Sequence, residues 1–165
     1  MYERSSAVIA VYLILQDSPT GKIFLIRRAN TGYMDGHWHL PSGHVEAGEL
    51  PTVAVTREGL EETGARVYSV ALTLVHISYR PEHDPTGNRL DLFYRTNMWK
   101  GTPRNAEPDK CSGVCWVHPT ELPNPITPHV AEAIERIRLG QTYSELGVPF
   151  LEKHGLLKSA QVKQK

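Results

Sequence analysis

Apolar residues fall along the chain in strand-length runs separated by polar turns. Five runs rich in apolar and β-branched residues are bounded by turn-forming residues and are predicted to be strands: residues 6–16, 22–28, 66–79, 90–100 and 113–118. The first two runs are joined by a Pro-Thr-Gly turn and are expected to form a hairpin or two neighbouring strands. The polar stretch 81–89 is expected to be a turn or a loop.

Two further segments, residues 51–63 and 127–139, have the spacing of amphipathic helices. Pro51 suits the first helical turn, where its missing N–H group is not needed, and Gly64 suits the position after the last turn. Thr127 is expected to cap the second helix. The predicted apolar stripes are Val53, Ala54 and Leu60 on the first helix and Val130, Ile134 and Ile137 on the second.

Strands on both sides of a central helix, with a second helix near the end, predict an α+β fold. A chain of 165 residues with 40% apolar and 22% charged residues is expected to form one domain over residues 1–150. The polar tail 151–165 is expected to be partly disordered. Lys plus Arg and Asp plus Glu each number 18, without a basic block, which argues against stable nucleic-acid binding.

The apolar run 7–15 follows Arg4 and superficially resembles a signal peptide. It is too short to span a bilayer, and no small-residue cleavage site follows it, so a buried strand in a cytoplasmic protein without membrane association is expected. Cys111, Cys115 and His118 supply only three potential zinc ligands, so reduced thiols are expected instead of a zinc site.

An acidic cluster is the strongest chemical signal in the chain. Glu58, Glu61 and Glu62 are three and four residues apart, so they share one face of the predicted helix. Like charges at that spacing repel each other and destabilise a helix. The cluster is either a solvated acidic surface or a site for a hard divalent cation, which prefers oxygen ligands.

The residues around the cluster favour the second interpretation. The segment GHVEAGELPTVAVTREGLEETGA resembles the Nudix box, G-x5-E-x7-R-E-U-x-E-E-x-G-U, in which U is apolar. The residues that match in register are Gly43, Glu49, Arg57, Glu58, Glu61, Glu62, Gly64 and Ala65. Gly59 departs from the pattern, which has an aliphatic residue there, at a cost in helix propensity of about 1 kcal/mol. The resemblance implies a Nudix fold, with a mixed β-sheet sandwiched between helices.

The resemblance also implies a reaction. Nudix enzymes hydrolyse a nucleoside diphosphate linked to another group, with Mg²⁺ and in some cases Mn²⁺. The expected substrate is a (deoxy)nucleoside triphosphate, released as monophosphate plus pyrophosphate. A nucleotide sugar such as ADP-ribose is the alternative within the family, and a catalytically silent nucleotide sensor is the alternative outside catalysis. An RNA-cap hydrolase is disfavoured by the neutral charge. Nothing in the sequence excludes a homodimer.

Residue roles follow from the resemblance. Glu58 and Glu62 are expected to bind the metal directly, Glu61 directly or through water, and Ser42 through its backbone carbonyl. Arg57 and Glu49 are expected to pair and to orient the helix against the preceding loop.

The remaining roles leave alternatives open. The general base is either Glu58 or Glu107, a carboxylate outside the box. Either Arg27 or Arg28 is expected to hold a substrate phosphate. Trp38 is a candidate for stacking on the base, together with Tyr33, Tyr79, Phe93 and Trp116. The histidines expected near the site are His37, His39, His44, His76 and His83.

Overall fold

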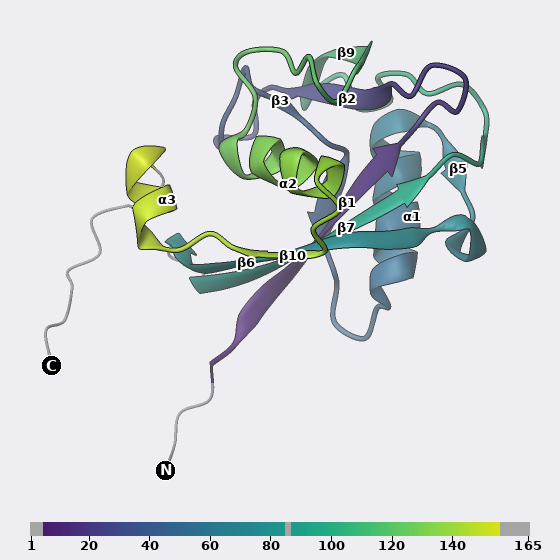
Figure 1. Ribbon diagram of the computed structural model, residues 1–165. Helices are drawn as coiled ribbons and strands as arrows, with labels where there is room; N and C mark the ends of the chain where they lie inside the picture. The colour runs from purple at the N-terminus through teal and green to yellow at the C-terminus, as the bar shows by residue number, and fades with distance from the viewer. Residues whose placement is uncertain (1–4, 85–86, 156–165) are drawn as a thin grey trace, which may run out of the picture.

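The computed structural model describes residues 5–84 and 87–155 (Figure 1). Its helices are α1 (Pro51–Thr63), the short 3₁₀ helix η1 (Ser69–Ala71), α2 (Pro128–Arg138) and α3 (Val148–Lys153). The strands are β1 (Ala7–Leu15), β2 (Ile23–Arg28), β3 (Trp38–His39), β4 (Ser42–His44), β5 (Arg66–Val67), β6 (Thr73–Asp84), β7 (Gly87–Thr96), β8 (Trp99–Lys100), β9 (Cys111–Val117) and β10 (Tyr143–Glu145).

A mixed five-stranded sheet forms the centre of the fold, with the order β10-β6-β7-β1-β4. Strand β1 runs parallel to β7 and antiparallel to β4, and β6 is antiparallel to β7. Strands β3, β2 and β9 form a separate antiparallel sheet, and β5 pairs with β8. The predicted α+β architecture with a mixed sheet is confirmed, although the strands are divided among three sheets instead of one.

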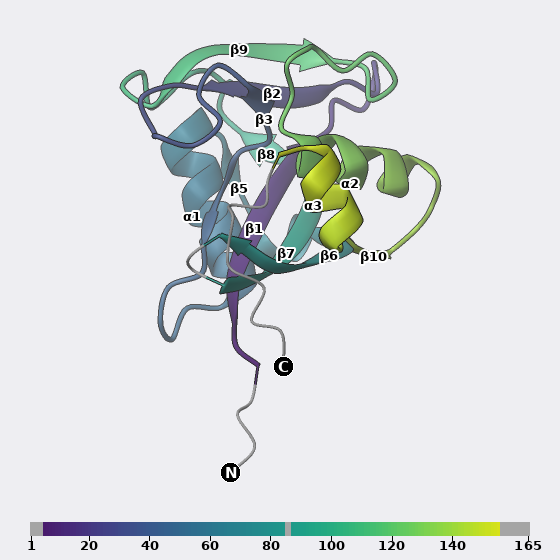
Figure 2. The ribbon, with the colours of Figure 1, turned by 90° about the vertical axis from the view of Figure 1, so that its left-hand side faces the viewer.

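The helices α1 and α2 lie on opposite sides of β1, as the two views show (Figures 1 and 2). Alternation along β1 produces two cores, because successive side chains of a strand point to opposite faces. Val11, Leu13 and Leu15 pack with the buried residues of α1. Ala10, Tyr12 and Ile14 pack with those of α2. One strand therefore supplies the interior on both sides of the sheet.

Several predicted strand boundaries were wrong. The segments 6–16 and 22–28 pair with each other only through the bridge between Gln16 and Ile23. Strands β1 and β2 themselves belong to different sheets. The predicted strand 66–79 is interrupted by η1. The stretch 81–89 is largely strand, because β6 continues through Asp84 and β7 begins at Gly87.

Two helix details also differ from the predictions. Of the predicted stripe of α1, Ala54 is buried, but Val53 and Leu60 are 47% and 43% exposed, and the helix buries Val55, Gly59 and Thr63 in their place. Thr127 precedes α2 but makes no side-chain cap, because its hydroxyl donates to the carbonyl of Trp38. That bond ties the start of α2 to β3. The proline and the C-terminal glycine of α1 lie where they were predicted.

Gly59 is explained by the packing of α1 on the sheet. A Cβ atom at this position would lie 2.5 Å from Cδ2 of Leu13, which is fully buried in β1. The absence of a side chain at Gly59 therefore leaves no gap in the core, because Leu13 fills the space that an aliphatic residue would take.

Replacing Gly59 with leucine is expected to destabilise the protein by about 1–3 kcal/mol through overpacking, despite the better helix propensity. Urea unfolding would measure the change. The double variant Leu13→Ala/Gly59→Leu should lose less free energy of unfolding than the two single variants lose together, because one substitution vacates the space that the other fills. Unchanged stability of Gly59→Leu alone would contradict this account.

The C-terminal part contains elements that the sequence did not indicate. Strand β10 extends the central sheet at its β6 edge, and α3 runs across the proposed boundary at residue 150. The predicted tail lies outside the described residues from 156 onward. Both cysteines are free thiols, as expected. Within the described ranges, no helix is long and apolar enough to cross a membrane.

Candidate active site

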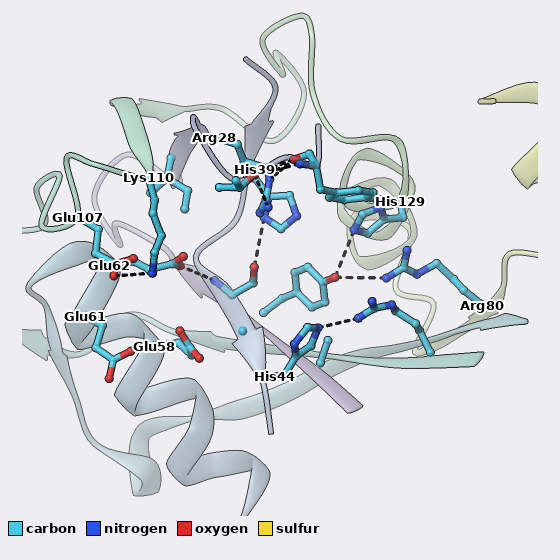
Figure 3. A pocket seen from close by; sticks show the side chains of 18 residues that line it. Arg28, His39, His44, Glu58, Glu61, Glu62, Arg80, Glu107, Lys110 and His129 are labelled. Atoms are coloured by element: carbon cyan, nitrogen blue, oxygen red, sulfur yellow. Dashed lines mark hydrogen bonds and ion pairs between the residues drawn. The ribbon is translucent and has the colours of Figure 1, made fainter. Parts of the chain in front are cut away.

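A cavity of about 440 Å³ opens between α1, β4 and the sheet (Figure 3). The acids of α1 form one end of it, because the pairing of Val11 with Gly43 holds β4 beside the helix. The four carboxylates that line the cavity are Glu58, Glu61, Glu62 and Glu107. The acids predicted from the sequence are therefore brought together with a fourth from a distant loop.

Arg57 fixes the loop before α1 to the helix. Its guanidinium donates to both carboxylate oxygens of Glu49, at 3.0 and 3.1 Å. It also contacts Glu58 Oε1 at 2.6 Å and the backbone carbonyl of His44 at 3.2 Å. The hydrogen bonds that Arg57 donates to Glu49, supported by Glu58, raise the pKa of Arg57. The predicted Arg57–Glu49 pair is confirmed, and neither residue lines the cavity.

Glu62 is the most perturbed acid of the cluster. Its Oε2 accepts a hydrogen bond of 2.7 Å from the backbone N–H of Ser42. Burial, followed by repulsion from Glu58 and Glu107, raises the pKa of Glu62 to about 8. A carboxylate that holds its proton this tightly marks a place where positive charge is lacking.

Glu58 packs directly against β4. A Cβ atom on Gly43 would overlap the Glu58 carboxylate, so only glycine leaves room for the side chain as it lies. Burial raises the pKa of Glu58 even though Arg57 donates to it, and Glu61 and Glu107 add repulsion. The side chain of Glu61 is 50% exposed at the rim.

Glu107 reaches the cavity because its loop docks onto the end of α1. The N–H of Ala106 donates to the carbonyl of Glu62, and the N–H of Arg104 donates to that of Thr63. The carboxylate of Glu107 pairs with Lys110 at 3.1 Å. Lys110 also lines the cavity and was not among the predicted residues.

The two arginines proposed for phosphate binding lie on opposite faces of β2. Arg28 lines the cavity, and its Nε donates to the carbonyl of Tyr33. Arg27 points elsewhere, donates to the carbonyl of Gly36 and lies 6.0 Å from the ring of Trp38. Neither Arg27 nor Trp38 lines the cavity. Of the other aromatic and histidine candidates, those that line it are Tyr33, His39 and His44.

Comparison with known proteins agrees with this geometry. A family model described as the NUDIX domain matches residues 6–137. The chain belongs to the Nudix family. This Nudix protein is 32% identical over 117 residues to a MutT-like protein of Streptomyces ambofaciens, covering 71% of the chain and 66% of that relative.

Two further relatives cover most of their own length. The 8-oxo-dGTP diphosphatase of Escherichia coli K12 is 28% identical over 129 residues, 75% of this chain and 93% of that protein. The crystal structure of a MutT NUDIX hydrolase from Burkholderia pseudomallei matches with a TM-score of 0.70 at 27% identity, covering 79% of this chain and 98% of that one. The chain is a Nudix pyrophosphohydrolase of the MutT-like branch.

The acidic end of this Nudix site suits a hard divalent cation by its chemistry. The available donors are carboxylate and backbone oxygens, which Mg²⁺ and Mn²⁺ prefer. The pKa of Glu62 is raised chiefly by burial and further by repulsion from Glu58 and Glu107, and a bound cation would offset both effects. Within the described residues, no three acidic, histidine or cysteine side chains converge closely enough to hold an ion as they stand. Glu58 is turned toward Arg57, so binding requires its carboxylate to reorient.

The other end of the cavity has a polar floor that sequence reasoning missed. Arg80 of β6 pairs with Asp91 of β7, and Tyr12 of β1 contacts His129 of α2 at 3.2 Å. These side chains come from elements far apart in sequence, so no local motif marks them. The signal available in the sequence was the charge of Arg80, directly after one predicted strand, and of Asp91, within another, since buried ionic groups need partners.

Proposed function

We propose that this Nudix pyrophosphohydrolase uses Mg²⁺, or Mn²⁺ in its place, to hydrolyse a nucleoside triphosphate to a nucleoside monophosphate and pyrophosphate. Glu58, Glu62 and the carbonyl of Ser42 would hold the cation, with Glu61 as a direct or water-bridged ligand. A bound cation neutralises phosphate oxygens and activates water for attack on phosphorus.

The observation that carries the proposal is the grouping of carboxylates and cations in one cavity. Glu58, Glu61 and Glu62 share it with Arg28 and Lys110. Acids alone would repel a polyphosphate, and basic residues alone would bind it without a place for the metal. Together they provide both a cation platform and side chains that neutralise the remaining phosphate charge.

Two carboxylates of the cavity, Glu58 and Glu107, are the candidates to accept the proton of the attacking water. We assign this role to Glu58, because its carboxylate lines the cavity beside the other acids of α1, and burial raises its pKa, which is the direction that suits a base. Glu107 also lines the cavity but is paired with Lys110. Arg57 and Glu49 act by holding Glu58 and the loop in position, because small misplacements of catalytic groups are costly.

Two observations favour a nucleoside triphosphate over the alternatives. The Escherichia coli relative, whose alignment covers 93% of that protein, is named an 8-oxo-dGTP diphosphatase, which favours this class over a nucleotide sugar. Every acid of the box is present and lies at the cavity or in the Arg57 pair, which favours an enzyme over a silent sensor.

A panel of (d)NTPs and ADP-ribose, assayed with Mg²⁺ for release of pyrophosphate or monophosphate, tests the proposal. We expect pyrophosphate from at least one triphosphate and loss of the activity with EDTA. Hydrolysis that EDTA does not affect would contradict the metal assignment. Preference for ADP-ribose would contradict the substrate class, and inactivity across the whole panel would favour the sensor.

A further inference from the structure

We propose that Arg80 is a specificity-determining residue that donates a hydrogen bond to a carbonyl oxygen of the substrate's base, so that the site favours 6-oxopurines over 6-aminopurines. The proposal rests on the proposed function only in taking the ligand to be a nucleotide. It concerns the end of the cavity away from the acidic cluster.

Arg80 is an unusual buried cation. It is 2% exposed, and Asp91, its partner on the neighbouring strand, is 0% exposed. Nε and Nη2 donate to the two carboxylate oxygens at 2.6 and 3.0 Å. The remaining nitrogen, Nη1, is buried and makes no hydrogen bond of ordinary length and angle to the described residues, although Arg80 interacts with Tyr33, another residue that lines the cavity. A buried donor without a partner costs stability, so it calls for an explanation.

The location of Arg80 supplies that explanation. It lines the cavity together with Tyr12, His39 and His129. Figure 3 shows Arg80 and His129 at the opposite end from Glu58, Glu61 and Glu62. A nucleotide whose phosphates meet the acids and their cation therefore places its base toward Arg80.

The charge balance at Arg80 favours a neutral ligand group. The charge of the guanidinium is balanced by the carboxylate of Asp91, and the two side chains are buried together. The pair has no net charge, so it offers directional donors without attracting an anion strongly. A base carbonyl suits such a donor better than a phosphate does.

His39 adds an acceptor to the same region. Its Nδ1 lies 2.6 Å from the carbonyl of Leu40, and a carbonyl only accepts, so Nδ1 carries the proton. In the neutral ring, the other nitrogen is then an acceptor. The ring centroid lies 5.6 Å from that of Tyr12 and 5.7 Å from that of His129.

A donor and an acceptor in one region distinguish the two purine classes. A 6-oxopurine presents a carbonyl acceptor beside an N–H donor at N1. A 6-aminopurine presents the reverse order, an amino donor beside an unprotonated N1. In a 6-aminopurine, the amino group would face the guanidinium of Arg80. Both groups are donors, so neither would have an acceptor.

Equilibrium binding of IMP and AMP, measured by calorimetry without a hydrolysis step, tests the proposal. We expect the native protein to bind IMP at least about tenfold more tightly than AMP, a ratio within the range of one good base contact. Arg80→Lys keeps the charge opposite Asp91 but removes the distal donor, and should reduce the preference to below about threefold. Arg66→Lys, at an exposed position of β5, is the matched control and should keep the preference.

A second comparison needs no variant, in case Arg80→Lys folds poorly. The native protein should bind purine riboside monophosphate, which lacks the 6-oxygen, at least about tenfold more weakly than IMP. Equal affinities for IMP and AMP, or a preference that survives in folded Arg80→Lys, would overturn the proposal. Failure to hydrolyse any triphosphate would contradict the proposed function but leave this binding result readable.

Discussion

Glu62→Gln is expected to lower metal-dependent hydrolysis by roughly 10²-fold or more while leaving the fold intact. Glutamine has nearly the same shape, and its side-chain oxygen can still accept the hydrogen bond from the N–H of Ser42. The substitution removes only the negative charge that would face the cation. Steady-state turnover on the best triphosphate, with circular dichroism as the folding check, measures the effect. Near-normal turnover would show that Glu62 is not a metal ligand.

The stability of the same variant provides an internal control. In the cation-free protein the pKa of Glu62 is raised from 4.5 to about 8, chiefly by burial. The folded state therefore binds an extra proton between these values, and the native free energy of unfolding falls as the pH rises through this window. Glutamine does not titrate, so in EDTA the variant should be more stable relative to native at pH 9 than at pH 6. Urea unfolding at both pH values would show it, and a difference independent of pH would contradict the burial of Glu62.

Gly43→Ala is expected to reduce activity by roughly 10- to 100-fold with little loss of stability. The new methyl group would occupy the position of the Glu58 carboxylate. The Glu58 side chain is flexible and borders the cavity, so it can swing away at small cost. Displacing it removes both a proposed metal ligand and the proposed base. The ratio of kcat/KM values, with thermal unfolding measured in parallel, separates this effect from damage to the fold.

Gly113→Ala in β9 is the matched control. Its added methyl group would lie 3.8 Å from the nearest heavy atom, in the Trp38 ring, which is an ordinary contact. Activity and stability should both stay close to native. Equal activity in the Gly43 and Gly113 variants would mean that the position of Glu58 does not matter for the reaction.

The acidic end of the site was predictable because its chemistry is encoded locally. Glu58, Glu61 and Glu62 follow one another on a single helix, and Gly43 and Glu49 precede it in the same segment. Helical geometry places the acids on one face, and the match to a known motif fixes their register. The Arg57–Glu49 pair could be inferred for the same reason, and the structure contains it.

The polar floor could not be predicted, because three strands and a helix assemble it. Arg80 and Asp91 meet only through the register of β6 on β7, and the break in that register between Arg80 and Asp84 has no sequence signal. The choice between Arg27 and Arg28 depended likewise on which face of β2 meets the cavity. A one-residue shift would have exchanged them, since adjacent strand residues point in opposite directions.

The pairing of β1 with β4 has a consequence for the length of a ligand. Tyr12 of the floor lies directly opposite Ser42, whose N–H holds Glu62, in a ladder of only three residue pairs. The pairing of β1 with β4 therefore fixes the distance between the proposed base-binding end of the cavity and the proposed metal-binding end. A change in the register of this ladder is therefore expected to alter the preferred length of the substrate, because it would move Ser42, and the Glu62 carboxylate that Ser42 holds, relative to Tyr12.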